Sequence, residues 1–327
     1  MKAAILVGPK EFRVDDIDEP KVSDDGFVIR VKSVGVCGTD IHEYNQGHGQ
    51  RGHEYSGEVV EVGPNAKGVK VGDRVAGRGG PAFAEYMAVS RGLHDTVTSG
   101  AVLLPEDMSH ELACMIEPVS CGLNAVELAQ PGPDDVVVVL GGGMLGQAVW
   151  QSMRARGAGK IIVSEIGTRR LDVTRSLGAD VVVKADEEDL VSVINGITGG
   201  NGADIVADCV GSEATFQTAV DIAKGGGFWQ AIRRRGAPTT ELGAKIVMVG
   251  LGGNTRIPTE QVIIKGLTII GSICGELTAA RDLMADGKID MTPLITHEYS
   301  LTEINDALNM ASNPHDALKV LVKPGEE

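Results

Sequence analysis

The chain has 327 residues, of which 43% are hydrophobic, enough for about two domains of ordinary size rather than one core. Its 30 basic and 45 acidic side chains leave a formal charge of −15, which argues against nucleic acid or an anionic membrane surface as a partner. The five cysteines are scattered, and we expect no disulfide framework, signal peptide or membrane-spanning stretch, as in a cytoplasmic protein.

The first hundred residues predict a small antiparallel β-barrel or sandwich. Short runs rich in β-branched residues alternate with turn signals such as Gly63-Pro64-Asn65. The expected strands cover residues 3–7, 26–34, 55–62, 74–76 and 84–89. From Ser109 to Val126 the apolar residues recur at helical spacing, and we expect Pro118 to kink this helix where it leads into a second domain.

The second domain opens with a pattern that binds dinucleotides. A buried strand over 136–140 precedes the turn GGGMLG, whose glycines fit G-x-G-x-x-G, and a helix over 144–156 follows. In such a unit the glycines let the backbone approach a pyrophosphate at the amino end of the helix. Glu165, nineteen residues after Gly146, would accept hydrogen bonds from a ribose and repel a 2′-phosphate, which favours NAD, although Arg169 or Arg170 would tolerate that phosphate. The predicted cofactor-binding residues are Gly141, Gly143, Met144, Leu145, Gly146, Glu165 and Arg170.

Strands and helices then alternate, which predicts a doubly wound parallel sheet. The expected strands cover 181–183, 204–207 and 245–249, with helices from about 186 and 213. The polar segment 228–243, with arginines at 233, 234 and 235, is interpreted as a solvated insertion, or as a lid, subunit contact or clamp for an anionic substrate. A last helix over 301–310 and a strand over 319–323 are expected to pack on the first domain. The predicted organisation is 1–120, 121–273 and 274–327.

A possible metal site lies between Val34 and Val60. Cys37, His42, His53 and Glu54 supply a thiol, two imidazoles and a carboxylate, a set that suits zinc better than magnesium or calcium. Further along, Glu117 stands among apolar residues, where burying an unpaired carboxylate is costly unless a metal neutralises it.

Six motifs together resemble one protein family. CGTDIH, GHEYSGEVVEVG, GVKVGDRV, FAEYMAV, IEPVSCGLNAV and VVLGGGMLGQ occur here in the order seen in zinc-dependent medium-chain dehydrogenases of the alcohol dehydrogenase superfamily. The pair Glu117-Pro118 is similar to that of the sorbitol, butanediol and threonine dehydrogenase branch. The resemblance implies an α/β protein with a GroES-like β-barrel catalytic domain and a Rossmann domain, one catalytic zinc, NAD as cofactor, and a homodimer or homotetramer.

The resemblance also implies roles for the metal-site residues. Cys37 and His53 would hold the zinc. Glu54 and Glu117 would supply the remaining protein ligand, or exchange with each other at that ligand position. Because one thiolate and one carboxylate already neutralise Zn²⁺, we hypothesise that the two glutamates bind alternately.

Three further residues complete the expected machinery. By resemblance, the Thr39 hydroxyl would take the proton from the alcohol and pass it through a cofactor ribose to His42, which titrates near neutral pH. Asp40 would either orient a metal ligand or form a local Asx-type turn. The cysteines at 114, 121, 209 and 274 are interpreted as small core residues.

Two departures from the family pattern bear on function. No four-cysteine lobe follows the G-D-R-V motif, so we expect no structural zinc. Cys37 and His53 are only sixteen positions apart, which shortens a loop and would open the cleft to a bulkier or cyclic substrate. The expected function is NAD-dependent oxidation of a secondary alcohol (a polyol, vicinal diol or cyclic alcohol) to a ketone. The alternatives are a hydroxy-acyl or amino-alcohol substrate with an anionic group near residues 233–235, and a dinucleotide-binding protein without catalysis.

Overall fold

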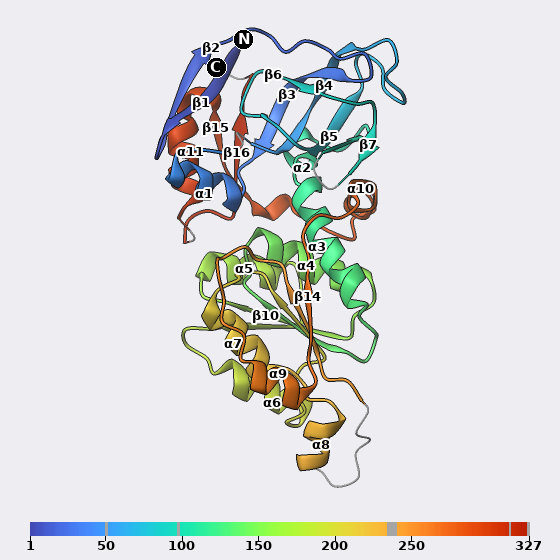
Figure 1. Cartoon of the computed structure of the whole chain (residues 1–327), viewed down its shortest axis with the longest axis vertical. Coiled ribbons are helices and arrows are strands. Elements are labelled where there is room, and N and C mark those ends of the chain that lie inside the picture. Colours follow the sequence, from blue (N-terminus) through green and yellow to red (C-terminus); the bar gives the residue numbers. More distant parts are fainter. Residues whose placement is uncertain (50–51, 97–98, 234–240, 314, 326–327) are drawn as a thin grey trace. The chain divides into compact units, whose positions relative to one another are not determined.

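The computed structural model describes residues 1–49, 52–96, 99–233, 241–313 and 315–325. The chain forms two compact units: unit 1 comprises Met1–Ser120 and Glu276–Glu327, and unit 2 comprises Cys121–Gly275. Figure 1 labels the elements of both. The predicted α/β class is confirmed, since unit 1 is built mainly of antiparallel strands and unit 2 is a doubly wound parallel sheet.

Unit 1 is organised around an eight-stranded sheet, in the order β15-β16-β3-β4-β5-β8-β7 with β6 also paired to β3. Its strands are β3 Phe27–Gly35, β4 Glu54–Val62, β5 Arg74–Arg78, β6 Tyr86–Val89, β7 His94–Asp95, β8 Gly100–Leu103, β15 Ile295–Ser300 and β16 Lys319–Lys323, beside a separate hairpin of β1 Lys2–Gly8 and β2 Glu11–Asp16. The last strand, β16, pairs antiparallel with the end of β3, where Leu321 lies opposite Gly35. The carboxyl-terminal segment thereby joins the sheet of the first hundred residues.

The helices of unit 1 pack against several of its strands. They are α1 Gly38–Gln46, α2 His110–Ala113, the start of α3 Ile116–Ala129, α10 Leu277–Ala285 and α11 Ile304–Ala311, with 3-10 turns at Thr292–Leu294 and Leu301–Glu303. Ile304, Ala307 and Leu308 of α11 are buried and pack with strand residues such as Phe27 and Val322. Spacing of three and four residues puts these side chains on one face of the helix.

The helix predicted from Ser109 is interrupted at residues 114–115, one turn before Pro118. Pro118 has no N–H to donate to the carbonyl of Cys114, four residues earlier, so the break follows from the proline. The expectation that no stretch reaches the length of a membrane span was wrong: His110–Ala129 is 20 residues long with a mean hydropathy of 1.3 in its most apolar window. Within the described residues, 72% of that window is buried inside the protein, as in a core helix.

The sheet of unit 2 has six parallel strands in the order β11-β10-β9-β12-β13-β14. Their bounds are β9 Val136–Leu140, β10 Lys160–Glu165, β11 Val181–Lys184, β12 Ile205–Asp208, β13 Lys245–Met248 and β14 Thr268–Gly271. Val138 and Val206 pack with residues of α6 Leu190–Thr198 and α7 Glu213–Ile222, whereas Val137 and Val139 pack with residues of α3 and of α4 Met144–Ala155. Both faces are covered, which explains the uninterrupted apolar run that predicted β9.

The helices of unit 2 lie on both faces of this sheet (Figure 1): α4 Met144–Ala155, α5 Thr168–Ser176, α6 Leu190–Thr198, α7 Glu213–Ile222, α8 Gly227–Arg233 and α9 Thr259–Lys265. The helix expected from about 186 begins at Leu190, because Asp189 caps it by accepting hydrogen bonds from the N–H groups of Val191 and Ser192. The segment 228–243 begins within helix α8. Arg234, Arg235 and the side chain of Arg233 lie outside what the structure describes.

Candidate functional site

The first predicted metal ligand, Cys37, stands at the amino end of α1. β3 ends at Gly35, and Cys37 takes the extended conformation of an N-cap residue, with φ −98° and ψ 159°. Its backbone N–H donates to Oδ2 of Asp40, 2.8 Å away. The carboxylate thus fixes the backbone of Cys37 and the direction in which its thiol leaves the helix.

The same carboxylate reaches the start of β4. Oδ1 of Asp40 accepts the N–H of Gly52 at 3.2 Å and lies 3.5 Å from Nδ1 of His53. Gly52 has φ +77°, a conformation that glycine adopts readily, where the chain bends into β4. Asp40 is 3% exposed. Within the described part of the chain it forms no Asx-type turn; its carboxylate reaches back to Cys37 as one half of a capping box and also faces His53, in line with the expected orienting role.

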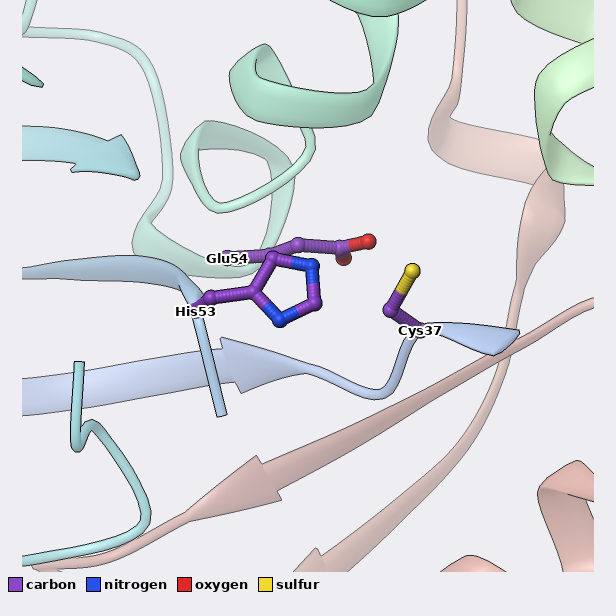
Figure 2. A group of neighbouring side chains, drawn as sticks. All are labelled: Cys37, His53 and Glu54. Atoms are coloured by element: carbon purple, nitrogen blue, oxygen red, sulfur yellow. The ribbon is translucent and has the colours of Figure 1, made fainter. Parts of the chain in front are cut away.

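Three predicted ligands converge at this point. The sulfur of Cys37, a ring nitrogen of His53 and a carboxylate oxygen of Glu54 all lie within 4.8 Å of one another. Figure 2 shows the ends of the three side chains facing each other. Glu117 is buried, in the first turn of α3, and among the described residues it is not a member of this group.

Lys319 is the residue of this site that the sequence analysis missed. Its Nζ donates to Oε2 of Glu54 and, at 3.0 Å, to the carbonyl of Val36, and both charged side chains are at most 2% exposed. Gly35 makes room for the pair, because a Cβ there would lie 2.2 Å from Oε2 of Glu54 and 2.6 Å from Cε of Lys319. A lysine inside the apolar run Ala317-Leu318-Lys319-Val320-Leu321 was the available signal, since a buried lysine needs an anionic partner.

The electrostatics of the group favour a cation. Burial lowers the pKa of His53, but hydrogen bonds with Asp40 and Cys37 raise it by more, to about 12. Burial and the charge of Glu54 raise the pKa of the Cys37 thiol, against the opposing effect of His53. Both directions favour the protonated forms of His53 and Cys37 in the metal-free protein, and a bound metal would displace both protons. Cys37, Asp40 and Glu54 are then negative and Lys319 is positive, so two negative charges remain. A divalent cation neutralises them, and the sulfur, nitrogen and oxygen donors fit zinc.

The two residues expected to move protons lie on the exposed face of α1. Oγ1 of Thr39 is 3.8 Å from Sγ of Cys37, and Nε2 of His42 is 2.7 Å from Nε2 of Gln46 one turn further along. Both side chains belong to exposed residues. Their separation of three residues places them on adjacent positions of one helix face, next to the thiol.

The glycine-rich turn of unit 2 has the geometry that its spacing predicted. Gly141 has φ +95°, and its N–H donates to the carbonyl of Ser164 at 2.8 Å. A Cβ at Gly146 would lie 1.8 Å from the carbonyl oxygen of Gly141, so only glycine lets α4 begin this close to β9. Gly143 is the N-cap residue of α4, and Met144 and Leu145 form its first turn. The amino end of α4 therefore offers N–H groups to an anion.

Glu165 is anchored to this turn. Its Oε2 accepts the N–H of Gly142 at 2.7 Å, and its Oε1 accepts those of Ile166 and Gly167 at 2.7 and 2.8 Å. Nη1 of Arg170 lies 3.7 Å from Oε2. Three backbone donors therefore hold the carboxylate in place beside the turn.

Both residues line a cavity of about 690 Å³ within unit 2, a size that suits a nucleotide. Its walls also include Val210, Ser212 and Thr215, which follow β12 and were missed from the sequence. Asp208 shapes that loop, since its carboxylate accepts the N–H groups of Val210 and Gly211 and the hydroxyl of Thr215. Their signal was position, because ligands of doubly wound sheets bind where the parallel strands end.

The remaining cysteines are not all core residues. Cys114 is buried, as predicted, and its sulfur lies 3.2 Å from the carbonyl of Glu111. Cys209 is partly exposed but packs against a hydrophobic core cluster of unit 2, whereas the expectation was wrong for Cys121 and Cys274, which are partly exposed. Cys209 lines the cavity of unit 2 because it directly follows a strand end.

Comparison with known proteins places both units. Residues 23–98 match the alcohol dehydrogenase GroES-like domain, and residues 145–229 match the zinc-binding dehydrogenase domain. The chain is 28% identical to sorbitol dehydrogenase of Bacillus subtilis (strain 168) over 99% of its length and 97% of that protein, and 28% identical to D-xylulose reductase of Saccharomyces cerevisiae over 99% and 98%. The crystal structure of 2R,3R-butanediol dehydrogenase from Bacillus subtilis superimposes with a TM-score of 0.83, at 26% identity and 99% coverage of both chains.

Proposed function

Since the chain belongs to the zinc-dependent medium-chain alcohol dehydrogenases, we propose that it oxidises a secondary alcohol of a polyol or vicinal diol to a ketone, with NAD as hydride acceptor. The observation that carries the proposal is the convergence of Cys37, His53 and Glu54 in unit 1 of a chain whose unit 2 holds a dinucleotide-type cavity. The named activities of the relatives, on sorbitol, xylulose and butanediol, support the polyol and diol class. They do not favour a hydroxy-acyl or amino-alcohol substrate, or a protein without catalysis.

We assign the zinc to Cys37, His53 and Glu54. Bound zinc would polarise the substrate hydroxyl as a Lewis acid, and bound NAD would accept the hydride. Asp40 would accept a hydrogen bond from the Nδ1–H group of His53 and so leave Nε2 for the metal. Lys319 holds one carboxylate oxygen of Glu54 and leaves the other for the metal.

Lys319 also revises the charge argument for Glu117. With Asp40 included, Cys37, Asp40, Glu54 and Glu117 carry four negative charges, and a zinc ion with Lys319 carries three positive ones, so simultaneous binding of both glutamates leaves one excess negative charge. We therefore propose Glu54 as the constant ligand and Glu117 as the one that exchanges. Zinc stoichiometry of Glu54→Ala and Glu117→Ala decides between them: the first should lose zinc and the second retain it.

Residues outside the metal group transfer the proton and bind the cofactor. We propose that Thr39 takes the substrate proton and that His42 delivers it to water, since both lie on the exposed face of α1 beside Cys37. In unit 2, Oε2 of Glu165 accepts one backbone hydrogen bond and retains capacity for a ribose hydroxyl. Its charge opposes a 2′-phosphate, which supports NAD over NADP.

We propose one zinc per chain, a homodimer or homotetramer and a cytoplasmic location. The cysteines are confined to positions 37, 114, 121, 209 and 274, so the segment after the G-D-R-V motif has no thiols for a structural zinc. β14 lies at one edge of the six-stranded sheet and offers backbone groups for pairing with a second copy. Metal analysis and light scattering test these points.

The decisive experiment is NADH formation with a panel of polyols, vicinal diols, cyclic alcohols, hydroxy-acyl compounds and amino alcohols, each with NAD and NADP. We expect reduction of NAD with polyols or diols, loss of activity on zinc removal and recovery on zinc addition. Cys37→Ser serves as the matched control, because it removes one ligand without changing the cofactor cavity. Zinc-independent turnover, or turnover confined to anionic substrates, would refute the proposed function.

A further inference from the structure

Two cysteines outside the candidate metal group lie close together in unit 2. Cys121 stands on α3, and Cys274 stands in the segment that follows β14. Their sulfur atoms lie within 4.8 Å of each other, and both residues are partly exposed. Two thiols this close need only side-chain rotation to reach bonding distance when the backbone positions allow it, and small oxidants can reach partly exposed sulfurs.

A neighbouring hydrogen bond fixes the two backbones beside each other. Nδ2 of Asn124, one turn after Cys121 on α3, donates to Oγ of Ser272 at 2.9 Å. Residues three apart on a helix share a face, as do residues two apart on an extended chain. Asn124 and Cys121 therefore lie on the face of α3 that meets Ser272 and Cys274 in the segment after β14. This pairing of the two segments brings the sulfur atoms close together.

The position of the pair in the chain gives it a mechanical role. Cys121 is the first residue of unit 2, and Cys274 is the last but one. The chain thus passes from unit 1 into unit 2 at one cysteine and returns at the other. A covalent bond between them would tie the two passages together, and would close nearly the whole of unit 2 into one loop.

We propose that Cys121 and Cys274 form a reversible disulfide on reaction with a small-molecule disulfide, and that this bond slows turnover by restricting movement between the units. One cysteine thiolate attacks glutathione disulfide and releases one glutathione; the second thiolate then displaces the other glutathione and completes the bond. The cysteine pair loses two protons and two electrons, and glutathione disulfide becomes two glutathione thiols. The effect on turnover rests on the proposed function, whereas the bond itself does not.

Methionine positions allow a clean test of the bond in the zinc-loaded full chain. Cyanogen bromide cleaves after methionine and places each cysteine on its own fragment: 2–87, 109–115, 116–144, 154–248 and 249–284. After treatment with glutathione disulfide, mass spectrometry should show fragment 116–144 joined to 249–284. The joined species should disappear on reduction. Turnover should fall by about threefold or more and recover with the reductant.

Cys121→Ser and Cys274→Ser are the matched controls, since each keeps Cys37 and removes one partner. Both should turn over like the untreated protein and keep that rate in the oxidant. Absence of the joined fragment from the natural chain overturns the proposal, as does unchanged turnover when the fragment forms. Equal losses in the natural chain and both variants overturn it too, because Cys37 would then be the target. If no alcohol is oxidised, the proposed function fails, while the joined fragment still supports the disulfide.

Discussion

Lys319→Met tests whether the buried ion pair sets the charge of the metal site. Methionine keeps an unbranched side chain of similar length and removes the positive charge beside Glu54. Both partners are at most 2% exposed, so the substitution leaves a buried carboxylate without its cation. Removing one partner of a buried pair costs about 3–5 kcal/mol, and we expect zinc-free Lys319→Met to lose that much free energy of unfolding.

Zinc should restore part of this loss. A zinc ion in the group of Cys37, His53 and Glu54 places two positive charges near the carboxylate that Lys319 has left. If the ion recovers about 1.4 kcal/mol, linkage requires the variant to bind zinc about tenfold more tightly than the natural chain. Urea unfolding with and without zinc measures the stabilities, and competition with a chromogenic chelator measures the affinity.

The double variant Glu54→Gln with Lys319→Met is the matched control. It removes both charges, so its zinc-free free energy of unfolding should lie within about 1 kcal/mol of that of the natural chain. The effects of the two single substitutions should therefore not add, and the difference is the coupling energy between Glu54 and Lys319. Lys319→Met that is as stable as the natural chain without zinc would refute the ion pair as a stabilising contact. A variant that binds zinc more weakly would refute the charge argument.

Three other substitutions probe the site and the fold. Gly35→Ala would place a Cβ 2.2 Å from Oε2 of Glu54, so we expect a loss of about 1–3 kcal/mol in urea unfolding and a lower zinc content. Glu165→Gln removes the charge that repels a 2′-phosphate, and the ratio of kcat/KM for NADP to that for NAD should rise about tenfold in initial-rate assays. Burial and the charge of Arg74 lower the pKa of His110 from 6.5 to about 4. Between these pH values the unfolded chain binds a proton at this histidine and the folded chain does not, so the free energy of unfolding falls as the pH drops. His110→Leu should flatten that part of the profile by about 1 kcal/mol, a figure discounted for the partial exposure of the ring.

Each of these has an outcome that contradicts it. Full zinc content and unchanged stability in Gly35→Ala would mean that the ion pair has room for a methyl group. An unchanged cofactor ratio in Glu165→Gln would place the discrimination elsewhere, with Arg170 the next residue to test. A pH profile of His110→Leu that follows the natural chain would show that other groups titrate between pH 6.5 and 4.

Local patterns predicted the parts of this protein that depend on neighbouring residues. The run at 136–140, the glycine turn and α4 follow one another within a short stretch, so spacing alone predicts β9 and the direction of the turn. Asp189 illustrates the limit: the helix was expected from about 186, and the capping bonds of Asp189 show that α6 begins at Leu190.

Helix α1 was not predicted from the sequence. The sequence patterns predict no element in the glycine-rich stretch between the strands expected at 26–34 and 55–62, yet Gly38–Gln46 is helical. Its start depends on the carboxylate of Asp40, which accepts the N–H of Cys37 and also reaches Gly52 and His53. A side chain that bonds two segments at once has no periodic signature, so the sequence left its role open between two alternatives.

The contact that sequence patterns could least predict is also the one that balances the charge of the metal group. Glu54 and Lys319 are 265 positions apart, and they meet because β16 pairs with β3 and places Leu321 opposite Gly35. The pairing sets Lys319 beside the carbonyl of Val36, just before Cys37, where its charge acts on Glu54 and on the thiol. A metal ligand set read from residues 37–54 alone is therefore too negative by one charge, and the return of the chain to the first sheet is part of the site's electrostatics.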